Sequence, residues 1–287
     1  MKSHYPTSFA EIGEWATANK VSVNEAKIRF AQYGVLRAIA GSEVLSSSIV
    51  FKGGNALDFI WQPNRSTKDL DFSSINSDLS EEEIKKSITL SLQRAGRETG
   101  IAFRLQRFRQ NPRGSDKTFI TYDISIGYAL PDDESSRKKI ERGDSVALVV
   151  PLEISINEIV CEMTTIDLKG IHSLKVSTPE DIVAEKLRAL LQQQIRKRSR
   201  CQDMLDIAVI LRNRELNRAA VADYLQRKAA ARDVQVSLAA FRHEELRNRA
   251  QIGYDELEGK TRELFIPFEE AYQQVMSFVA TLNLPEN

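Results

Sequence analysis

The sequence contains little cysteine or histidine and has no long apolar run. Its 287 residues include 2 cysteines and 3 histidines, which are too few for a disulfide framework and too scattered for a His/Cys zinc site. No apolar stretch approaches the length of a membrane span, and the first residues lack the apolar core of a secretion signal. We therefore expect a cytoplasmic protein with no membrane segment.

The composition is that of an ordinary globular protein, but its charge is unevenly distributed. Hydrophobic residues make up 42% and charged residues 28%, with a formal net charge of zero that indicates no particular partner. Residues 186–232 carry 12 lysines and arginines against 4 acidic residues. On charge alone this excess indicates a solvated helical face. Beside a phosphate-handling site, the same excess would also serve RNA binding.

The stretch 49–74 joins a strand, a glycine turn, a helix and a second strand. Residues 49–51 are an apolar strand that runs into Gly53-Gly54, and residues 55–61 carry apolar side chains at helical spacing. Pro63 ends this helix. Residues 68–72 follow as the second strand, on which Asp69 and Asp71 share one face because alternate side chains of a strand point the same way.

The two carboxylates and the two glycines together indicate nucleotide chemistry. Adjacent carboxylates repel each other, and magnesium (or manganese) relieves this repulsion while leaving positions for substrate phosphates. Paired glycines let main-chain amides approach a phosphate closely. Either half alone would indicate only a glycine turn or two solvated aspartates. Their joint order in this stretch favours nucleotidyl transfer.

Two segments of this stretch resemble the first signature of a known toxin family. They are Lys52-Gly53-Gly54-Asn55-Ala56-Leu57 and Arg65-Ser66-Thr67-Lys68-Asp69-Leu70-Asp71-Phe72. The resemblance is to AbiEii/AbiGii-type nucleotidyltransferase toxins, which are MenT-like members of the DNA polymerase β-like superfamily. Family members usually carry threonine where Asn55 stands and serine where Thr67 stands. The resemblance implies nucleotide binding by Lys52, Gly53, Gly54, Arg65 and Thr67.

A third carboxylate is expected from a later strand. Residues 152–156 alternate as a strand, on which a lone glutamate is ordinarily exposed to solvent. The resemblance of Leu152-Glu-Ile-Ser-Ile156 to the second family motif makes Glu153 the expected third metal ligand beside Asp69 and Asp71. Glu158 is an alternative that needs a bulge to share this face, and Asp123 is a weaker one.

Two further segments resemble the third and fourth family motifs. Residues 184–190 match the family pattern Ala-x-Lys-Leu-x-Ala-Leu. This resemblance implies that Lys186 contacts the triphosphate. From the residues alone, the simpler interpretation is an exposed lysine that pairs with the acidic residues of its own helix. Residues 200–206 match Arg-x-Lys-Asp-x-x-Asp, with glutamine in place of the usual basic residue. Asp203 is expected to orient Lys186 or the incoming base, and Asp206 to be mostly structural.

The pattern of elements predicts an α/β (α+β) fold. We expect a mixed nucleotidyltransferase sheet flanked by helices in residues 1–175, including N-terminal helices, and a helical domain in 176–287 that carries Lys186 and Asp203. Helix starts are predicted from capping patterns at Ser8, Ser22 and Ser80, and at Ser177 or Thr178. A turn is predicted over 112–115 and a polar surface loop over 132–144.

The predicted function is NTP-dependent nucleotidyl transfer to RNA, with the tRNA 3′ end as one acceptor, by a two-metal mechanism. Glu153 or a metal-bound hydroxyl would help to deprotonate the acceptor. The resemblance implies the toxin of a bacterial toxin–antitoxin or phage-defence pair, with a cognate antitoxin as partner. The alternatives are transfer to a protein or small molecule, a non-catalytic nucleotide-binding switch, and an antitoxin or structural partner. We also hypothesise that phosphorylation of Thr67 would disfavour triphosphate binding.

Overall fold

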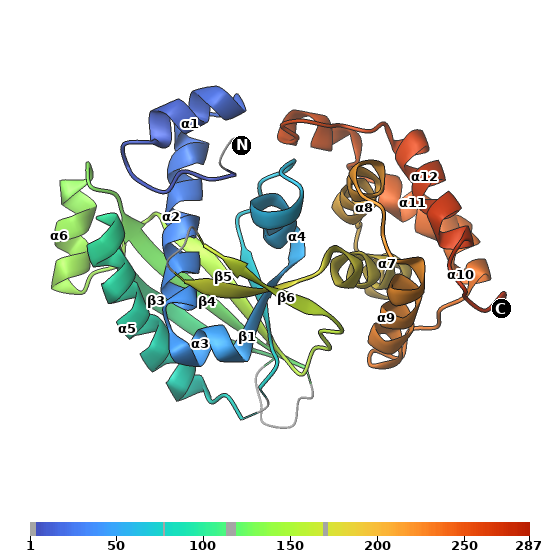
Figure 1. Cartoon of the computed structure of the whole chain (residues 1–287), viewed down its shortest axis with the longest axis horizontal. Coiled ribbons are helices and arrows are strands. Elements are labelled where there is room, and N and C mark those ends of the chain that lie inside the picture. Colours follow the sequence, from blue (N-terminus) through green and yellow to red (C-terminus); the bar gives the residue numbers. More distant parts are fainter. Residues whose placement is uncertain (1–3, 77, 113–118, 169–171) are drawn as a thin grey trace. The chain divides into compact units, whose positions relative to one another are not determined.

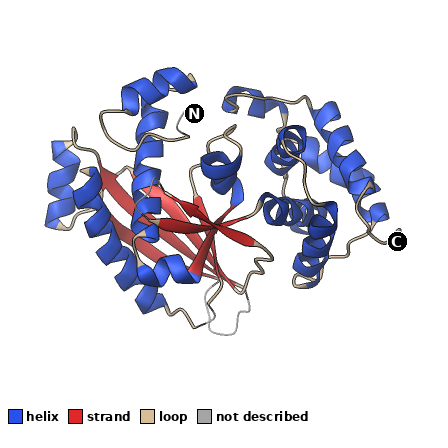
Figure 2. Cartoon of the chain, viewed as in Figure 1, coloured by secondary structure: helices blue, strands red, loops and turns tan. Residues whose placement is uncertain are grey.

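A mixed sheet and a set of helices form two compact units of the chain (Figures 1 and 2). The computed structural model describes residues 4–76, 78–112, 119–168 and 172–287, so most of the turn predicted at 112–115 lies outside the described residues. The sheet unit comprises residues 1–60, 67–158 and 164–176. The helical unit comprises residues 61–66, 159–163 and 177–287.

The sheet of the described chain has seven strands in the order β3-β4-β5-β2-β1-β7-β6. Strand β2 pairs in parallel with β5, and β1 in parallel with β7, whereas β1–β2, β3–β4 and β4–β5 are antiparallel. The fold is therefore the predicted mixed sheet with flanking helices. The strands are β1 (Ile49–Lys52), β2 (Leu70–Ser74), β3 (Ala102–Asn111), β4 (Ile120–Ala129), β5 (Val149–Ile156), β6 (Met163–Asp167) and β7 (Ser173–Ser177).

The central strands carry an apolar row and a polar row on opposite faces. Phe51, Phe72, Ile154 and Tyr122 are register partners across β1, β2, β5 and β4, and all four are buried. One residue along each strand, the side chains point to the other face. That second row consists of Lys52, Asp71, Glu153 and Asp123. The sheet alternation thus separates the core from the candidate chemistry.

Helices α2 and α5 pack together, and α5 also packs against β3 (Figure 1). Ser22 caps α2, and Ser80 and Glu83 form the predicted capping box of α5. The capping box predicted at Ser8 is wrong, because α1 has Glu11 at its N-cap and no side-chain capping bond. The helices of this unit are α1 (Ile12–Asn19), α2 (Val23–Ala40), α3 (Glu43–Ser48), α4 (Gly53–Ala56), α5 (Glu81–Thr99) and α6 (Glu134–Arg142), with a π-helical turn at Leu57–Trp61. None of the helices in the described residues is long and apolar enough to cross a membrane.

Helix α6 replaces the loop predicted over 132–144, so that prediction is wrong. The Asp133 side chain accepts a hydrogen bond from the Ser136 amide and so caps the first turn. Gly143 ends the helix in the left-handed conformation, with φ of 85°. No residue of this helix is buried, so it lacks the apolar face that makes a helix recognisable in a sequence.

The helical unit is built around α7 and its neighbours α8 and α9. Thr178 caps α7 through the Asp181 amide, and Pro179 occupies its first turn as predicted. The helices are α7 (Pro179–Arg196), α8 (Cys201–Asn213), α9 (Arg218–Ala230), α10 (Leu238–Arg242), α11 (Glu244–Gln251) and α12 (Phe268–Ala280), with a 3-10 turn at Asp255–Lys260. Val183, Leu187, Leu205 and Leu225 are fully buried among them.

Candidate active site

Asp71 occupies the space that Gly53 leaves by having no side chain. Gly53 has a φ of +73°, and a Cβ built on it would lie 2.6 Å from an Asp71 carboxylate oxygen. Lys52 is the register partner of Asp71. Only glycine takes this backbone conformation readily and also permits this approach. The glycine turn therefore brings main-chain atoms of β1 and α4 next to the carboxylate of β2.

The glycines begin the following helix instead of forming a separate turn before it. Helix α4 starts at Gly53, includes Gly54, and gives way to the π-helical turn, whereas the sequence predicted a helix over 55–61. Lys52 has extended backbone angles, so the chain changes direction between Lys52 and Gly53. The positive φ of Gly53 makes this change possible without the strain that a side chain would add.

Asp69 lies just before β2, which starts at Leu70, two residues later than predicted. The Asp69 side chain is exposed, while its main-chain carbonyl accepts a 2.6 Å hydrogen bond from the Asn55 amide. Asp69 therefore has no register partner on the described strands β1 and β5. Asp69 and Asp71 are therefore held differently, the first by its main chain and the second by its neighbours in the sheet.

Asn55 ties the segment before β2 to the rest of the sheet unit. Its side-chain amide also donates to the carbonyl of Thr67 at 3.0 Å, and its side-chain oxygen accepts from Arg29 at 3.1 Å. Gln32 donates to the carbonyls of Thr67 and Lys68 at 2.9 and 3.0 Å. Asn55 is completely buried, so these bonds replace water that cannot reach the amide. The sequence pattern identified Asn55 only as a substitution within the family motif.

The Thr67 hydroxyl lies inside this segment. Its oxygen is buried and has no hydrogen-bond partner among the residues that the structure describes. A kinase could reach this oxygen only after the segment opened. The hypothesis of phosphorylation at Thr67 therefore carries a structural requirement that the sequence did not reveal.

The expected third carboxylate, Glu153, is the register partner of Asp71 on the adjacent parallel strand. Asp123 is in turn the register partner of Glu153 on β4. Directly opposed side chains lie within about 5 Å of each other at Cβ. Glu153 is exposed, whereas the Asp123 carboxylate accepts a hydrogen bond from Asn111. Glu153 is thus the strand carboxylate adjacent to Asp71, with Asp123 one strand further away.

Glu158 also reaches this face, because the strand alternation breaks before it. Strand β5 ends at Ile156, and Asn157 follows with a φ of +61°. The Glu158 carboxylate then forms an ion pair with Lys52 and accepts a 3.0 Å hydrogen bond from the Ser73 hydroxyl. Glu158 therefore reaches the polar face through a left-handed residue rather than the bulge expected from the sequence. Its observed partner is the lysine of the glycine motif.

Lys186 lies in a separate cluster of buried charges inside the helical unit. Its ammonium group donates to Asp203 at 2.6 Å and to Asp206 at 2.8 Å. Asp206 also accepts from Arg65 at 2.9 Å. Arg200 lies 3.5 Å from the other oxygen of Asp203. Two carboxylates thus hold three cations together, and Asp206 links two of the expected nucleotide-binding residues.

The pKa values in this cluster follow from its pairing. Burial opposes the charge of Lys186, but the carboxylates of Asp203 and Asp206 outweigh it and raise the pKa of Lys186 above its usual value. Burial likewise opposes the charge of Asp206, but Lys186 and Arg65 outweigh it and lower the pKa of that carboxyl. Both groups are therefore charged at neutral pH, and Lys186 can serve as a fixed cation but not as a proton carrier.

The oxygen donors of the sheet unit suit magnesium without forming a closed set of ligands. Among the described residues, no three His, Cys, Asp or Glu side chains gather as a metal-binding group. Magnesium usually takes one or two protein carboxylates and completes its shell with water and substrate phosphates. Asp71, in the space beside Gly53, and Asp69, two residues earlier in the sequence, are the candidate carboxylates for such an ion. This donor set fits an ion whose shell the triphosphate completes.

A mixed sheet that brings strand carboxylates beside a glycine turn defines a protein of the nucleotidyltransferase class. The family model for the nucleotidyl transferase AbiEii toxin of type IV toxin–antitoxin systems matches residues 35–274. The chain therefore belongs to the AbiEii nucleotidyltransferase toxin family, as its motifs predicted, and is an enzyme that transfers nucleotides in a toxin–antitoxin context.

Solved structures with a similar fold come from Helicobacter pylori. The crystal structures of JHP933 and of a proposed nucleotidyltransferase from that organism both give a TM-score of 0.52 at 16% sequence identity. Each match covers 90% of this chain, with 90% and 92% of the respective solved chains. At this identity the likeness supports the fold. A search of curated proteins found no match.

Proposed function

We propose that the protein transfers a nucleoside monophosphate from an NTP to an RNA acceptor, and that tRNA 3′ ends are the first acceptor to test. The family supports nucleotidyl transfer in a toxin–antitoxin context. The observation that carries the proposal is the placement of Asp71 against Gly53, with a Cβ position only 2.6 Å from the carboxylate. A phosphate bound by the main-chain amides at this helix start would lie near the Asp71 carboxylate and any cation that it holds.

In this proposal the chain's own residues position the two reactants. The amides of Gly53 and Gly54 would bind the triphosphate. Glu153, which is exposed beside Asp71, would accept the proton of the acceptor hydroxyl. The hydroxyl oxygen forms a bond to the α-phosphorus, the bond to the β-phosphate oxygen breaks, and pyrophosphate leaves with that electron pair. Alignment and charge stabilisation therefore account for most of the catalysis.

Asp69 and Asp71 would hold magnesium or manganese, with Glu153 as the third ligand where two ions bind. The ion would supply charge neutralisation on the phosphates. Lys52 is engaged by Glu158 and lies 3.4 Å from Ser155. Lys52 could contact the triphosphate only if Glu158 released the lysine or shared it with the phosphates.

Lys186 and Arg65 are proposed as further triphosphate contacts, on the strength of the family motifs. Within the helical unit, hydrogen bonds to Asp203 and Asp206 fix the position of Lys186. Asp206 also fixes the position of Arg65. Three cations against two carboxylates leave the cluster with an excess positive charge, which suits a polyanion. Asp203 would then act by holding Lys186, not by binding metal.

We further propose a bacterial setting in which this enzyme acts in the cytoplasm as a toxin and its cognate antitoxin restrains it, with phage defence as the benefit. RNA acceptors and NTPs are both available there. Expression of the active enzyme without an antitoxin should then slow growth. The Asp71→Ala variant should not slow growth at equal protein levels.

The experiment incubates the purified chain with magnesium, each α-labelled NTP in turn, and total bacterial RNA or a protein lysate. The wild type should label small RNA with one preferred nucleotide. Asp71→Asn, which keeps the side-chain shape, should reduce labelling about a hundredfold or more. Label on protein instead would identify the alternative acceptor. NTP binding without any label would establish a non-catalytic switch, and an absence of NTP binding would leave an antitoxin or structural role.

A further inference from the structure

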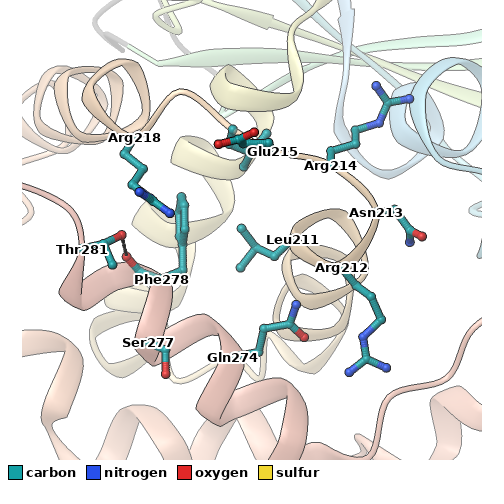
Figure 3. A pocket seen from close by; sticks show the side chains of 11 residues that line it. Leu211, Arg212, Asn213, Arg214, Glu215, Arg218, Gln274, Ser277, Phe278 and Thr281 are labelled. Atoms are coloured by element: carbon teal, nitrogen blue, oxygen red, sulfur yellow. Dashed lines mark hydrogen bonds between the residues drawn. The ribbon is translucent and has the colours of Figure 1, made fainter.

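A pocket of about 630 Å³ lies in the helical unit, and none of the candidate active-site residues lines it (Figure 3). The end of α8, the segment 214–216, the start of α9 and the last turns of α12 form its walls. Its volume falls within the range of about 300–1,000 Å³ that is usual for small-ligand sites. The pocket is therefore large enough for one nucleotide unit.

The charge of this pocket is predominantly positive. Arg212, Arg214 and Arg218 line it, against one acidic residue, Glu215. Figure 3 shows Arg218 on one side of Leu211, with Arg212 and Arg214 on the other. In Figure 3 the guanidinium group of Arg218 lies beside Phe278, whereas those of Arg212 and Arg214 point away from Leu211. Arg218 would therefore attract a phosphate next to a bound base, and the other two arginines would add a more general attraction for anions.

The three arginines differ in how far they are already engaged. Arg212 forms an ion pair with Glu270, and Arg214 donates to the main-chain carbonyl of Trp61. In the part of the chain that the structure describes, Arg218 forms no ion pair. Arg218 is also exposed and reaches toward the Phe278 ring (Figure 3). It is therefore the cation most readily available to a ligand.

The lining of the pocket includes an aromatic ring and a buried side-chain oxygen. The Phe278 ring is half-buried beside the apolar Leu211. The side-chain oxygen of Gln274 is buried and accepts no hydrogen bond from the described residues. An apolar ligand carries no hydrogen-bond donor for this oxygen. A nucleotide supplies a ring for stacking, amino or hydroxyl donors, and a phosphate for the arginines.

We propose that this pocket binds one nucleotide of a single-stranded RNA, and so contributes to docking of the acceptor. The inference rests on the proposed RNA acceptor, and it deepens that proposal by assigning a binding site to the acceptor. The Phe278 ring stacks on a base, Arg218 contacts an adjacent phosphate, and Gln274 accepts a hydrogen bond from the base or ribose. A free nucleotide has the same chemistry, so the test must separate the two sources.

The test measures binding of a fluorescent single-stranded RNA to the full-length chain without NTP, and then the KM values for RNA and NTP. Arg218→Glu should raise the Kd and the KM for RNA about tenfold and leave the KM for NTP unchanged. The new glutamate would lie in the first turn of α9, where a negative charge favours the helix, so folding should be preserved. Phe278→Leu should raise the Kd about fivefold through lost stacking.

Arg242→Glu is the matched control, because it makes the same charge change at an exposed arginine of the same unit outside the pocket. It should leave the Kd for RNA within about twofold of the wild-type value, since only long-range attraction changes. Equal weakening by Arg218→Glu and Arg242→Glu would show diffuse attraction and overturn the proposal. Loss of free NTP binding in Arg218→Glu would also overturn the proposal. So would displacement of the fluorescent RNA by poly-glutamate as effectively as by unlabelled RNA.

The two proposals can fail separately. If the wild type binds RNA in an Arg218-dependent manner but labels no RNA, the pocket stands and the proposed acceptor fails. If the wild type labels RNA and Arg218→Glu has an unchanged Kd and KM for RNA, the proposed function stands and the pocket assignment fails. An absence of RNA binding by the wild type overturns the pocket assignment.

Discussion

Replacing Gly53 by alanine tests directly whether the glycine turn positions Asp71. Alanine at a φ of +73° costs about 1–2 kcal/mol in backbone strain. Its Cβ would lie 2.6 Å from the Asp71 carboxylate, where ordinary contacts begin at 3.4 Å. The carboxylate must therefore move by a large part of an ångström. A displacement of about 1 Å can reduce catalysis about a hundredfold.

Gly253→Ala is the matched control for this experiment. Gly253 has a φ of +75°, and nothing lies within 4 Å of its Cβ position. The Gly253→Ala variant should lose about 1–2 kcal/mol of stability in urea unfolding, but it should keep the wild-type rate of nucleotidyl transfer. Gly53→Ala should lose similar stability and about a hundredfold in kcat. Equal activity of the two variants would refute the idea that the Asp71 position depends on the space beside Gly53.

Three further predictions concern buried polar groups. Asn55→Ala should destabilise the chain by about 2–4 kcal/mol in urea unfolding, because the Asp69 carbonyl loses its amide donor, the Thr67 carbonyl keeps only Gln32 among the described donors, and the buried Arg29 loses an acceptor. A loss below about 1 kcal/mol would contradict this. Lys186→Met should cost about 3–5 kcal/mol, because the carboxylates of Asp203 and Asp206 stay buried without it, and adding Asp206→Asn should recover part of that loss. The pKa of Asp206 is lower in the folded chain than its unfolded value of about 3.9, so the ionised carboxylate stabilises the fold above about pH 3.9. This contribution should disappear as the pH falls through the folded pKa. The free energy of unfolding of Asp206→Asn should therefore vary less between about pH 5 and about pH 2 than that of the wild type.

Local sequence signals predicted the parts of the fold that depend on neighbouring residues. The capping serines of α2 and α5 and the Thr178-Pro179 start of α7 fix hydrogen bonds within one turn. Alternation along β2 and β5 likewise placed Asp71 and Glu153 on the polar side, because strand geometry has a period of two. Helix α6 was missed because its residues have no buried face.

The rest of the candidate site depends on contacts between distant residues, which spacing does not encode. The left-handed Asn157 brings Glu158 to Lys52, although alternation alone would put Glu158 on the opposite face. Asn55 holds the carbonyls before β2 across more than ten residues of sequence. Asp206, expected to be mostly structural, joins Arg65 to Lys186. Each of these contacts can be recognised only in the folded chain.

We propose that the chain transfers the α-phosphate and its nucleoside at the site of Asp71. The most direct measurement compares α-labelled with γ-labelled NTP in parallel reactions of the wild type and Asp71→Asn with RNA. We predict that α-label becomes covalently attached to RNA, that γ-label is released as pyrophosphate, and that both events are lost in Asp71→Asn. Transfer of γ-label to the acceptor, or full α-label transfer by Asp71→Asn, would contradict the account.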